Sequence, residues 1–359
     1  MAPETSPMSF AALARAVKTD VDARLAALAK VKIAEAEKQS PEVARVVRAL
    51  FDVATRGGKR ARPAIACASH VACGGAPADA ATIGAGVALE VLHAYLLVHD
   101  DWMDGDDVRR GGPSAHVALR DAYDQQRGTA VDSTRAGEVG AILAGDFGQA
   151  FAFEALASID APRDRVVCAA REVARMLAEV VAGQVIDVRG AATTRDEVEA
   201  MHRLKTASYT TKTPLVLGAI FAGADASTRE ALRSAGDPMG VAFQLRDDVL
   251  GTFGDPARTG KSARSDLRRG KRTALVAELE GDRAARALLP RVLGVEDAPD
   301  EEIDALIARM VDGGAKARVE ARIAALLDAS RAQIEALAIS SEGKALLFGA
   351  IDALGARES

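Results

Sequence analysis

The chain has 359 residues, of which 49% are hydrophobic and 27% charged, as is usual for a globular protein. Its formal net charge of −5 gives no support for nucleic-acid binding, so an anionic ligand would need local clusters of lysine and arginine. The N-terminus lacks the pattern of a signal peptide, and no run of about 20 uncharged apolar residues occurs. We therefore expect a cytoplasmic protein without a transmembrane segment.

The composition favours helices throughout, because Ala, Leu, Glu and Arg are abundant and alternating patterns are scarce. Ser9 is expected to cap a helix that runs to about Lys38, and Pro41 to begin one that stops at Gly57-Gly58. Pro63 should lie in the first turn of a third helix, and Pro77 precedes a long apolar one. Further helices are expected at 137–158, 163–188, 195–222 and 228–250, with a helix end and flexible loop at 121–134 and a loop at 252–265.

No fixed-period repeat and no long linker divides the sequence. We therefore expect one all-α domain over residues 1–359, built as a single bundle of ten or more helices. Its parts would be an N-terminal helix within 1–40, a motif-bearing core at 57–273 and C-terminal helices at 274–359.

A short acidic stretch ends one of the most apolar segments of the sequence. After the aliphatic run of residues 83–98, the chain continues into five aspartates between Asp100 and Asp107, where basic residues or a glycine cap would be usual. Asp100 and Asp104 share a helix face, and two carboxylates there repel each other unless a cation lies between them. The stretch indicates a divalent metal site, with a solvated acidic loop as the alternative. Its spacing does not fit an EF-hand.

A second acidic pair strengthens the metal interpretation. In the stretch Phe243-Gln244-Leu245-Arg246-Asp247-Asp248-Val249-Leu250, paired aspartates again lie at the end of an apolar helical run. Magnesium prefers oxygen ligands and commonly bridges carboxylates to phosphates. Separate basic groups lie at Lys59-Arg60-Ala61-Arg62, at Arg109-Arg110, at Lys205 and after residue 260. Two acidic sites with so many cations would suit a pair of diphosphate substrates, and the apolar helices behind them would suit a hydrophobic tail.

The three cysteines do not form a convincing metal set. Cys67, His70 and Cys73 have a zinc-like spacing, but on a helix they spread over about 120° and lack a fourth ligand. We expect these cysteines and Cys168 to be core thiols in a reducing compartment.

The order of these motifs resembles the trans-type prenyl diphosphate synthases, or polyprenyl synthetase family, most closely the bacterial geranylgeranyl diphosphate synthases. The resemblance extends from Gly57-Gly58-Lys59-Arg60-Ala61-Arg62-Pro63 to Lys271-Arg272-Thr273. Between them lie His93, Asp100-Asp101-x-x-Asp104, Arg109-Arg110-Gly111, Leu143-Ala144-Gly145-Asp146, Gly183-Gln184, Lys205-Thr206, Phe243-Gln244-x-x-Asp247-Asp248 and Gly260-Lys261.

The resemblance implies the isoprenoid synthase fold, with the two aspartate motifs facing a central cavity, and usually a homodimer. It implies an enzyme that condenses isopentenyl diphosphate with an allylic diphosphate, using three Mg²⁺ ions per active site. The roles that it implies fall into three groups. The metal ions would be held by Asp100, Asp104 and Asp247, with Asp101, Asp146 and Asp248 in support. The allylic diphosphate would be contacted by Arg109, Lys205, Gln244 and Lys261, with Thr206 near the reacting carbons. Isopentenyl diphosphate would be bound by Lys59, Arg62, His93 and Arg110, while Gln184 and Lys271 line the same site.

Product length in such enzymes is set by bulk below the first aspartate motif. The resemblance assigns this role to Tyr95 and Leu96 and implies a geranylgeranyl (C20) product, with farnesyl and longer products as alternatives. Tyr95 as an ordinary core aromatic is a second interpretation. The second motif has Gly251 where the family usually has an aspartate, which weakens the expectation of a third metal ion.

Two other classes of protein fit less well. A terpene cyclase would carry an Asn/Ser/Glu metal motif and would not need Lys59, Arg62 and Arg110 for a second diphosphate. A non-catalytic subunit of a heteromeric synthase would tend to lose the aspartates that this chain keeps.

Overall fold

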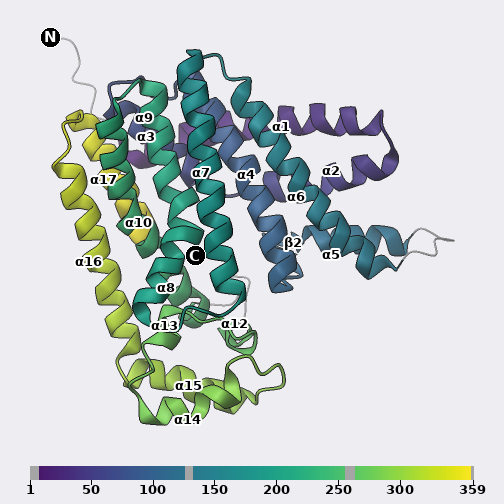
Figure 1. The fold of residues 1–359 in the computed structure, drawn as a ribbon, viewed down its shortest axis with the longest axis vertical. Helices are drawn as coiled ribbons and strands as arrows, with labels where there is room; N and C mark the ends of the chain where they lie inside the picture. The colour runs from purple at the N-terminus through teal and green to yellow at the C-terminus, as the bar shows by residue number, and fades with distance from the viewer. Residues whose placement is uncertain (1–7, 126–131, 255–262, 357–359) are drawn as a thin grey trace. The chain divides into compact units, whose positions relative to one another are not determined.

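The computed structural model describes residues 8–125, 132–254 and 263–356, and these residues form an almost entirely helical protein (Figure 1). The chain divides into two compact units, residues 1–171 with 217–224, and residues 172–216 with 225–359. Helices α7 (Arg163–Val188) and α9 (Thr213–Ala222) each begin in one unit and end in the other. The prediction of an all-α fold is confirmed, because the described residues contain helices and only one two-stranded hairpin.

The described residues of the first unit form six complete helices and a short hairpin. The helices are α1 (Phe10–Glu37), α2 (Pro41–Thr55), α3 (Ala61–Ala72), α4 (Ala80–Asp104), α5 (Ala115–Asp124) and α6 (Ser133–Ala157). Strands β1 (Val108–Arg109) and β2 (Gly112–Pro113) form the hairpin after α4. The sequence signals acted as expected, since the Ser9 hydroxyl accepts from the Ala12 amide at 3.2 Å and Pro41 is the first residue of α2.

Helices α4 and α6 pack closely in the core of this unit. A Cβ atom on Gly148 of α6 would lie 2.9 Å from the Tyr95 Cβ, so only glycine permits the observed approach. Both helices are long and apolar enough to span a membrane by length and composition alone. Of their most apolar windows, however, 67% and 39% are buried inside the protein, which makes them weak candidates for membrane segments.

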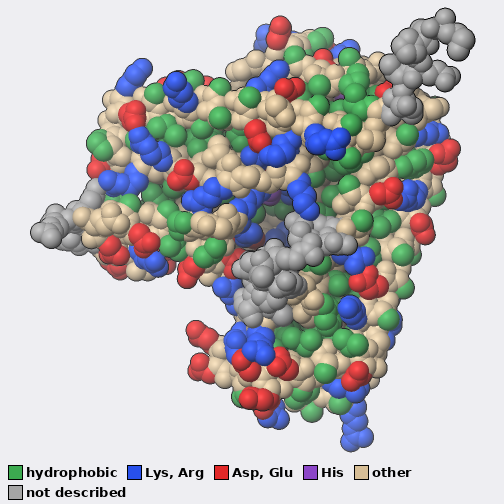
Figure 2. Space-filling view, turned by 180° about the vertical axis from the view of Figure 1, so that it is seen from behind, with side chains coloured by type: hydrophobic (Ala, Val, Ile, Leu, Met, Phe, Trp, Pro, Cys, Tyr) green, Lys and Arg blue, Asp and Glu red, His purple; other side chains and the backbone are tan. Residues whose placement is uncertain are grey.

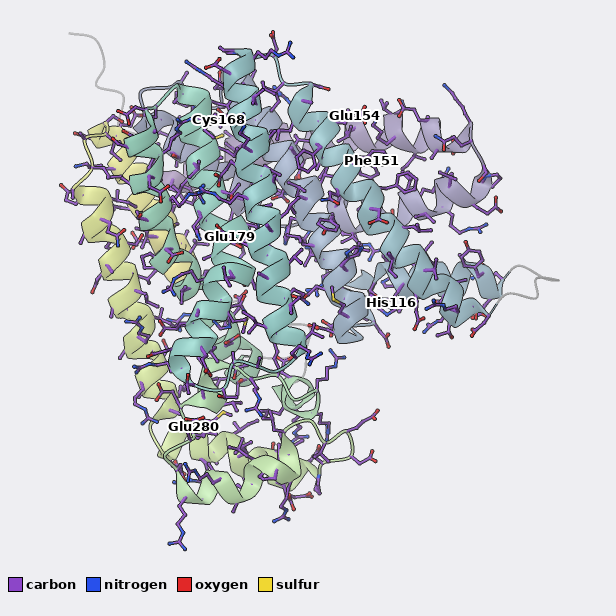
Figure 3. All side chains as sticks on the ribbon, viewed as in Figure 1. His116, Phe151, Glu154, Cys168, Glu179 and Glu280 are labelled. Atoms are coloured by element: carbon purple, nitrogen blue, oxygen red, sulfur yellow. The ribbon has the colours of Figure 1, made fainter. Side chains whose placement is uncertain are left out.

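Helix α1 lies against α2, α3 and α4 with one apolar face. Leu13, Val17, Val21 and Leu25 are buried there, as their spacing predicts. The Lys32 ammonium bonds Glu154 of α6 at 2.7 Å and lies 5.3 Å above the Phe151 ring; Figure 3 labels both α6 residues. The N-terminal helix is thus joined to the unit by charged as well as apolar contacts.

The second unit is built around α10 (Ala226–Phe253), which packs against η1 (Arg203–Lys212) and the long helix α16 (Ala315–Glu335). Its other helices are α8 (Arg195–His202), α12 (Ala263–Arg268), α13 (Ala274–Ala277), α14 (Arg283–Val292), α15 (Asp300–Asp312) and α17 (Ser341–Gly355). Leu245, Leu275, Ile303, Leu306 and Ile323 are buried in its core.

The predicted continuous helix 195–222 contains a π-helical segment, η1. Its residues are rich in Ser and Thr, whose hydroxyls compete with the backbone for carbonyl oxygens. The Ser208 hydroxyl donates to the Leu204 carbonyl at 2.6 Å, and the Thr211 hydroxyl donates to the Ala207 carbonyl at 3.0 Å. Such segments recur at functional sites, and this one carries Lys205 and Thr206.

The cysteines are free, in agreement with the sequence analysis. Burial raises the pKa of the Cys67 thiol to about 12. The His70 ring bonds Thr82 and lies 3.3 Å from the Gly218 carbonyl, which leaves it a structural rather than a metal-binding residue. On the face drawn in Figure 2, lysine and arginine side chains are interspersed with aspartate and glutamate.

Candidate active site

The first aspartate motif occupies the last turn of α4. Asp100 and Asp104 are partly exposed, whereas Asp101 is completely buried. The helix ends at Gly105 in the left-handed conformation, with φ of 65°. The sequence analysis expected this helix to end in aspartates without a glycine cap. That expectation is wrong, because Gly105 is the C-cap residue directly after the acidic turn. The three carboxylates thus separate into a partly exposed pair, Asp100 and Asp104, and one buried group, Asp101.

Arg109, on the hairpin, clamps the buried Asp101. Its Nε donates to Asp101 Oδ1 at 2.8 Å, and its Nη2 lies 3.5 Å from Asp106 Oδ2. Burial raises the pKa of Asp101, and the Arg109 guanidinium opposes that shift. Asp101 consequently orients Arg109 and joins the hairpin to the end of α4.

A group of basic residues gathers near the start of α3. Arg62 Nη1 lies 3.3 Å from His93 Nδ1, and Arg110 Nη1 donates to the Gly57 carbonyl at 3.2 Å. Burial, reinforced by the positive charges of Arg62 and Arg110, holds the pKa of His93 well below its usual range. His93 is therefore a neutral hydrogen-bonding residue between cations. The structure therefore brings together three of the four residues predicted to bind isopentenyl diphosphate, and the fourth, Lys59, is exposed in the turn before α3.

Arg60 departs from the expectation that all three cations of the Lys59-Arg60-Ala61-Arg62 turn suit a phosphate. Its side chain is directed inward, and the residue is only 3% exposed. It pairs with Glu90 of α4 and Asp22 of α1 instead. The basic turn therefore contributes Lys59 and Arg62 to its outer face.

Three predicted site residues of the second unit, Thr206, Gln244 and Asp248, form one chain of contacts. The Thr206 hydroxyl donates to Gln244 Oε1 at 2.9 Å, and Gln244 Nε2 donates to Asp248 Oδ1 at 3.2 Å. Asp248 Oδ2 lies 3.6 Å from the Nε2 atom of His202. Burial lowers the pKa of His202, with Lys271 and Lys205 acting in the same direction. Asp247, the neighbour of Asp248, is only partly buried.

Two residues of this group were missed in the sequence analysis, Asp187 and His202. Lys205 Nζ pairs with Asp187 Oδ2 at 2.5 Å, so the lysine predicted to contact the allylic diphosphate already has a counter-charge. Asp187 lies one turn after Gln184 on α7, and His202 lies one turn before Lys205; that spacing was the available signal. A Cβ atom on Gly183 would lie 2.4 Å from the Lys205 backbone nitrogen, which explains the glycine beside Gln184.

Tyr95 and Leu96 lie one to two turns below the first motif on α4. Tyr95 is buried, packs against Gly148 and makes an edge contact with His99 at 4.9 Å between ring centroids. Burial raises the pKa of its hydroxyl, and the negative charge of Asp146 on α6 adds to the shift. Asp146 itself is exposed, and Leu96 is partly buried.

Several predictions about the site remain untested. Lys261 and Gly260 lie outside the described residues. Asp100 belongs to the first unit and Asp247 to the second, so the convergence of the two motifs stays a prediction. Among residues 8–125, 132–254 and 263–356, no three His, Cys, Asp or Glu side chains are grouped as a metal site.

Paired aspartates close to the C-terminal ends of two helices, α4 and α10, with clustered cations in an almost entirely helical protein, are typical of a prenyl diphosphate synthase. The fold is similar to the crystal structure of geranylgeranyl pyrophosphate synthase from Corynebacterium glutamicum complexed with isoprenyl diphosphate and magnesium, and the similarity covers 97% of this chain. The match covers 99% of that chain, with a TM-score of 0.87 and 29% identity.

Residues 43–310 match the family model described as polyprenyl synthetase. A geranylfarnesyl diphosphate synthase of Aeropyrum pernix is 32% identical over 298 residues, which are 81% of this chain and 87% of that protein. A (2E,6E)-farnesyl diphosphate synthase of Mycobacterium tuberculosis is 36% identical over 275 residues, 74% and 70% of the two chains. The chain belongs to the polyprenyl synthetase family and is a prenyltransferase.

Proposed function

We propose that this prenyltransferase is a magnesium-dependent, chain-elongating synthase that joins isopentenyl diphosphate to an allylic diphosphate and releases geranylgeranyl diphosphate. One observation carries the proposal. Within a single unit, the partly exposed pair Asp100 and Asp104 lies in the last turn of α4, while His93 on the same helix lies beside Arg62 at the start of α3. Carboxylates for a metal-bound diphosphate and cations for a second diphosphate are thus supplied by neighbouring elements.

The donor set fits magnesium. Mg²⁺ is usually held by one or two carboxylates together with substrate phosphates, so a site of three protein ligands is not required. Asp100, Asp104 and Asp247 would hold the metal ions, three of them per active site. Asp101 and Asp248 each have one buried carboxylate oxygen without a hydrogen-bond partner among the described residues, and they would support the motifs from within. Bound Mg²⁺ would supply positive charge that stabilises the departing diphosphate.

The reaction would begin with cleavage of the allylic carbon–oxygen bond, which yields a carbocation and a diphosphate. Arg109 and Lys205, each oriented by a carboxylate, would face the growing negative charge, with Gln244 and Lys261 beside them. Lys59, Arg62, His93 and Arg110 would hold isopentenyl diphosphate while its double bond attacks the carbocation. A proton then leaves, passing to the released diphosphate. Apolar helix walls would keep water from the carbocation.

The oligomeric state is a further part of the proposal. Helix α7 exposes three valines at a spacing of four and three residues, Val181, Val185 and Val188, with exposures of 52%, 59% and 60%. An apolar stripe on one helix face favours burial against a partner. We propose that a second copy of this chain covers it in a cytoplasmic homodimer. We also propose that the two units act as one domain, because each carries one of the two aspartate motifs.

Product analysis of the purified enzyme tests the proposed function. We expect incubation with isopentenyl diphosphate and each of dimethylallyl, geranyl and farnesyl diphosphate to yield geranylgeranyl diphosphate, and chelation of magnesium to stop the reaction. Release of inorganic diphosphate with a cyclic hydrocarbon would indicate a terpene cyclase. Absence of turnover with all three primers would indicate a non-catalytic subunit.

Replacing Tyr95 by alanine is expected to lengthen the product. The buried ring lies one to two turns below Asp100, and its removal would leave space for at least one more isoprene unit. Chromatography of the dephosphorylated products measures the change. Tyr123→Ala, on α5, is the matched control and should leave the length unchanged. A Tyr95→Ala enzyme that still stops at the wild-type length would show that the pocket floor lies elsewhere.

A further inference from the structure

Arg60 is held by three helices of the first unit at once. Its Nε donates to Asp22 Oδ1 of α1 at 2.7 Å, and its Nη1 donates to Glu90 Oε2 of α4 at 2.5 Å. The third nitrogen, Nη2, donates to the Ala54 carbonyl of α2 at 3.0 Å. Every nitrogen of the guanidinium is therefore engaged, and its orientation is fixed by partners far away in the sequence.

The backbone at Arg60 explains why so many contacts are needed. Its φ of 49° and ψ of 40° place it in the left-handed region, which is costly for a residue with a Cβ atom. Such a conformation persists when the surrounding contacts over-determine it. Arg60 is also the N-cap residue of α3, and no side chain forms a capping hydrogen bond there. The bonds to Asp22 and Glu90 therefore hold the backbone at the entry to α3.

The residues on either side of Arg60 belong to the proposed isopentenyl diphosphate site. Lys59 precedes it and Arg62 follows two residues later, with Arg62 Nη1 3.3 Å from His93. Gly58 lies against the Arg110 guanidinium, since a Cβ atom built on it would be 3.4 Å from Nη1. A change in the Arg60 backbone would consequently redirect two of the site's cations and disturb the contact with a third.

The charge of Arg60 is neutralised within the protein, which distinguishes this residue from the proposed phosphate-binding residues Lys59 and Arg62. Its positive charge is balanced by two carboxylates, of which Glu90 is buried and Asp22 is partly exposed. A buried carboxylate beside Arg60 would repel a phosphate, which argues against direct contact between Arg60 and the ligand. Glu90 also acts on Arg110, where its charge opposes the lowering of the pKa by burial and by the other arginines.

We propose that Asp22 and Glu90 are positioning residues for isopentenyl diphosphate, acting through Arg60 on Lys59 and Arg62. The N-terminal helix α1 would then be part of the substrate site. This inference rests on the proposed function.

Steady-state kinetics of Asp22→Ala test the inference. We expect KM for isopentenyl diphosphate to rise about tenfold through loss of a charge-assisted bond to Arg60, while kcat and KM for the allylic primer stay within about twofold. Asp22→Asn keeps a hydrogen-bond acceptor for Arg60, so its KM for isopentenyl diphosphate should rise less than that of Asp22→Ala. Glu90→Gln should act in the same direction. The Asp22 side chain is 38% exposed, so its replacement should leave the fold intact, as the thermal midpoint would report.

Three controls separate positioning from other effects. Asp22 also pairs with Lys18 at 2.5 Å, so Lys18→Met removes that pair alone and should leave KM unchanged. Asp20→Ala removes an exposed carboxylate from the same helix and should also be neutral. In a double-mutant cycle, the combined effect of Asp22→Ala and Lys59→Ala on KM should be smaller than the product of the two single effects, because part of the Asp22 effect would pass through Lys59 and the rest through Arg62.

A change of less than twofold in KM for isopentenyl diphosphate in both Asp22→Ala and Glu90→Gln would overturn the inference. Equal losses for both substrates, or effects of Asp22→Ala and Lys59→Ala that simply multiply, would also overturn it. These outcomes leave the proposed function standing, since the wild-type enzyme would still elongate the primer. A wild-type enzyme without that activity would instead remove the proposed function, and this inference with it.

Discussion

Replacement of Asp100 or Asp247 by alanine is expected to lower kcat by at least about a thousandfold, because each would remove a carboxylate that holds the metal ions on the allylic diphosphate. Stability should respond differently from activity. Asp100 lies in the last turn of α4, where a negative charge opposes the helix dipole, so Asp100→Ala should stabilise the fold by about 0.3–1 kcal/mol. Turnover assays and denaturant unfolding of the same variants measure the two effects.

Asp107→Ala is the matched control for Asp100, because its side chain is 74% exposed and lies just beyond the same helix. It should retain wild-type turnover. Near-normal kcat in Asp100→Ala or Asp247→Ala would remove the metal-site interpretation for that motif. If Asp247→Ala lost its folded structure together with its activity, Asp247→Asn would decide the question. Asparagine keeps the shape of the side chain and removes its charge, so its turnover should still be lost.

Replacement of Glu172 by alanine should have the largest effect on stability, a loss of about 3–5 kcal/mol. Glu172, on α7, pairs with Arg233 of α10 and accepts from the Thr213 hydroxyl at 3.0 Å, and all three residues are buried. Its removal would leave the Arg233 guanidinium buried without its main counter-charge. The midpoint of guanidinium-induced unfolding measures the loss.

Two further variants make this prediction specific. Glu230→Ala removes an exposed carboxylate 3.6 Å from the same arginine and should change stability by no more than about 0.5 kcal/mol. The double variant Glu172→Leu/Arg233→Met replaces the pair with apolar side chains and should recover most of the loss. If Glu172→Ala proved no worse than Glu230→Ala, the buried pair would not be a determinant of stability.

Much of the fold follows from local signals. The predicted bounds of α7 agree with the structure, and the starts of α1 and α2 follow from Ser9 and Pro41. These signals work because capping and proline preferences act within one helical turn. The π-helical segment within 195–222 was not predicted, because it depends on which hydroxyl finds which carbonyl in a run of several Ser and Thr residues.

The candidate active site was also predicted in part from the sequence. The order and spacing of the motifs identified the family, and the first unit places Arg62, His93 and Arg110 near one another. The sequence did not reveal that Arg60 is directed inward, or that Asp187 pairs with Lys205. Both pairs join residues at least 18 positions apart, and charged residues near the surface have many possible partners in an unfolded chain.

The sequence by itself determined the helical class, the positions of most helices and the chemistry of the motifs, because these depend on residue type and near-neighbour spacing. Only the tertiary structure decided which carboxylate is buried and which cation is neutralised. Asp101 and Asp100 are adjacent and chemically identical, yet one is buried against Arg109 and the other is partly exposed. Arg60 reaches Asp22 and Glu90 across 38 and 30 residues, and only packing of α1, α3 and α4 brings these charges together.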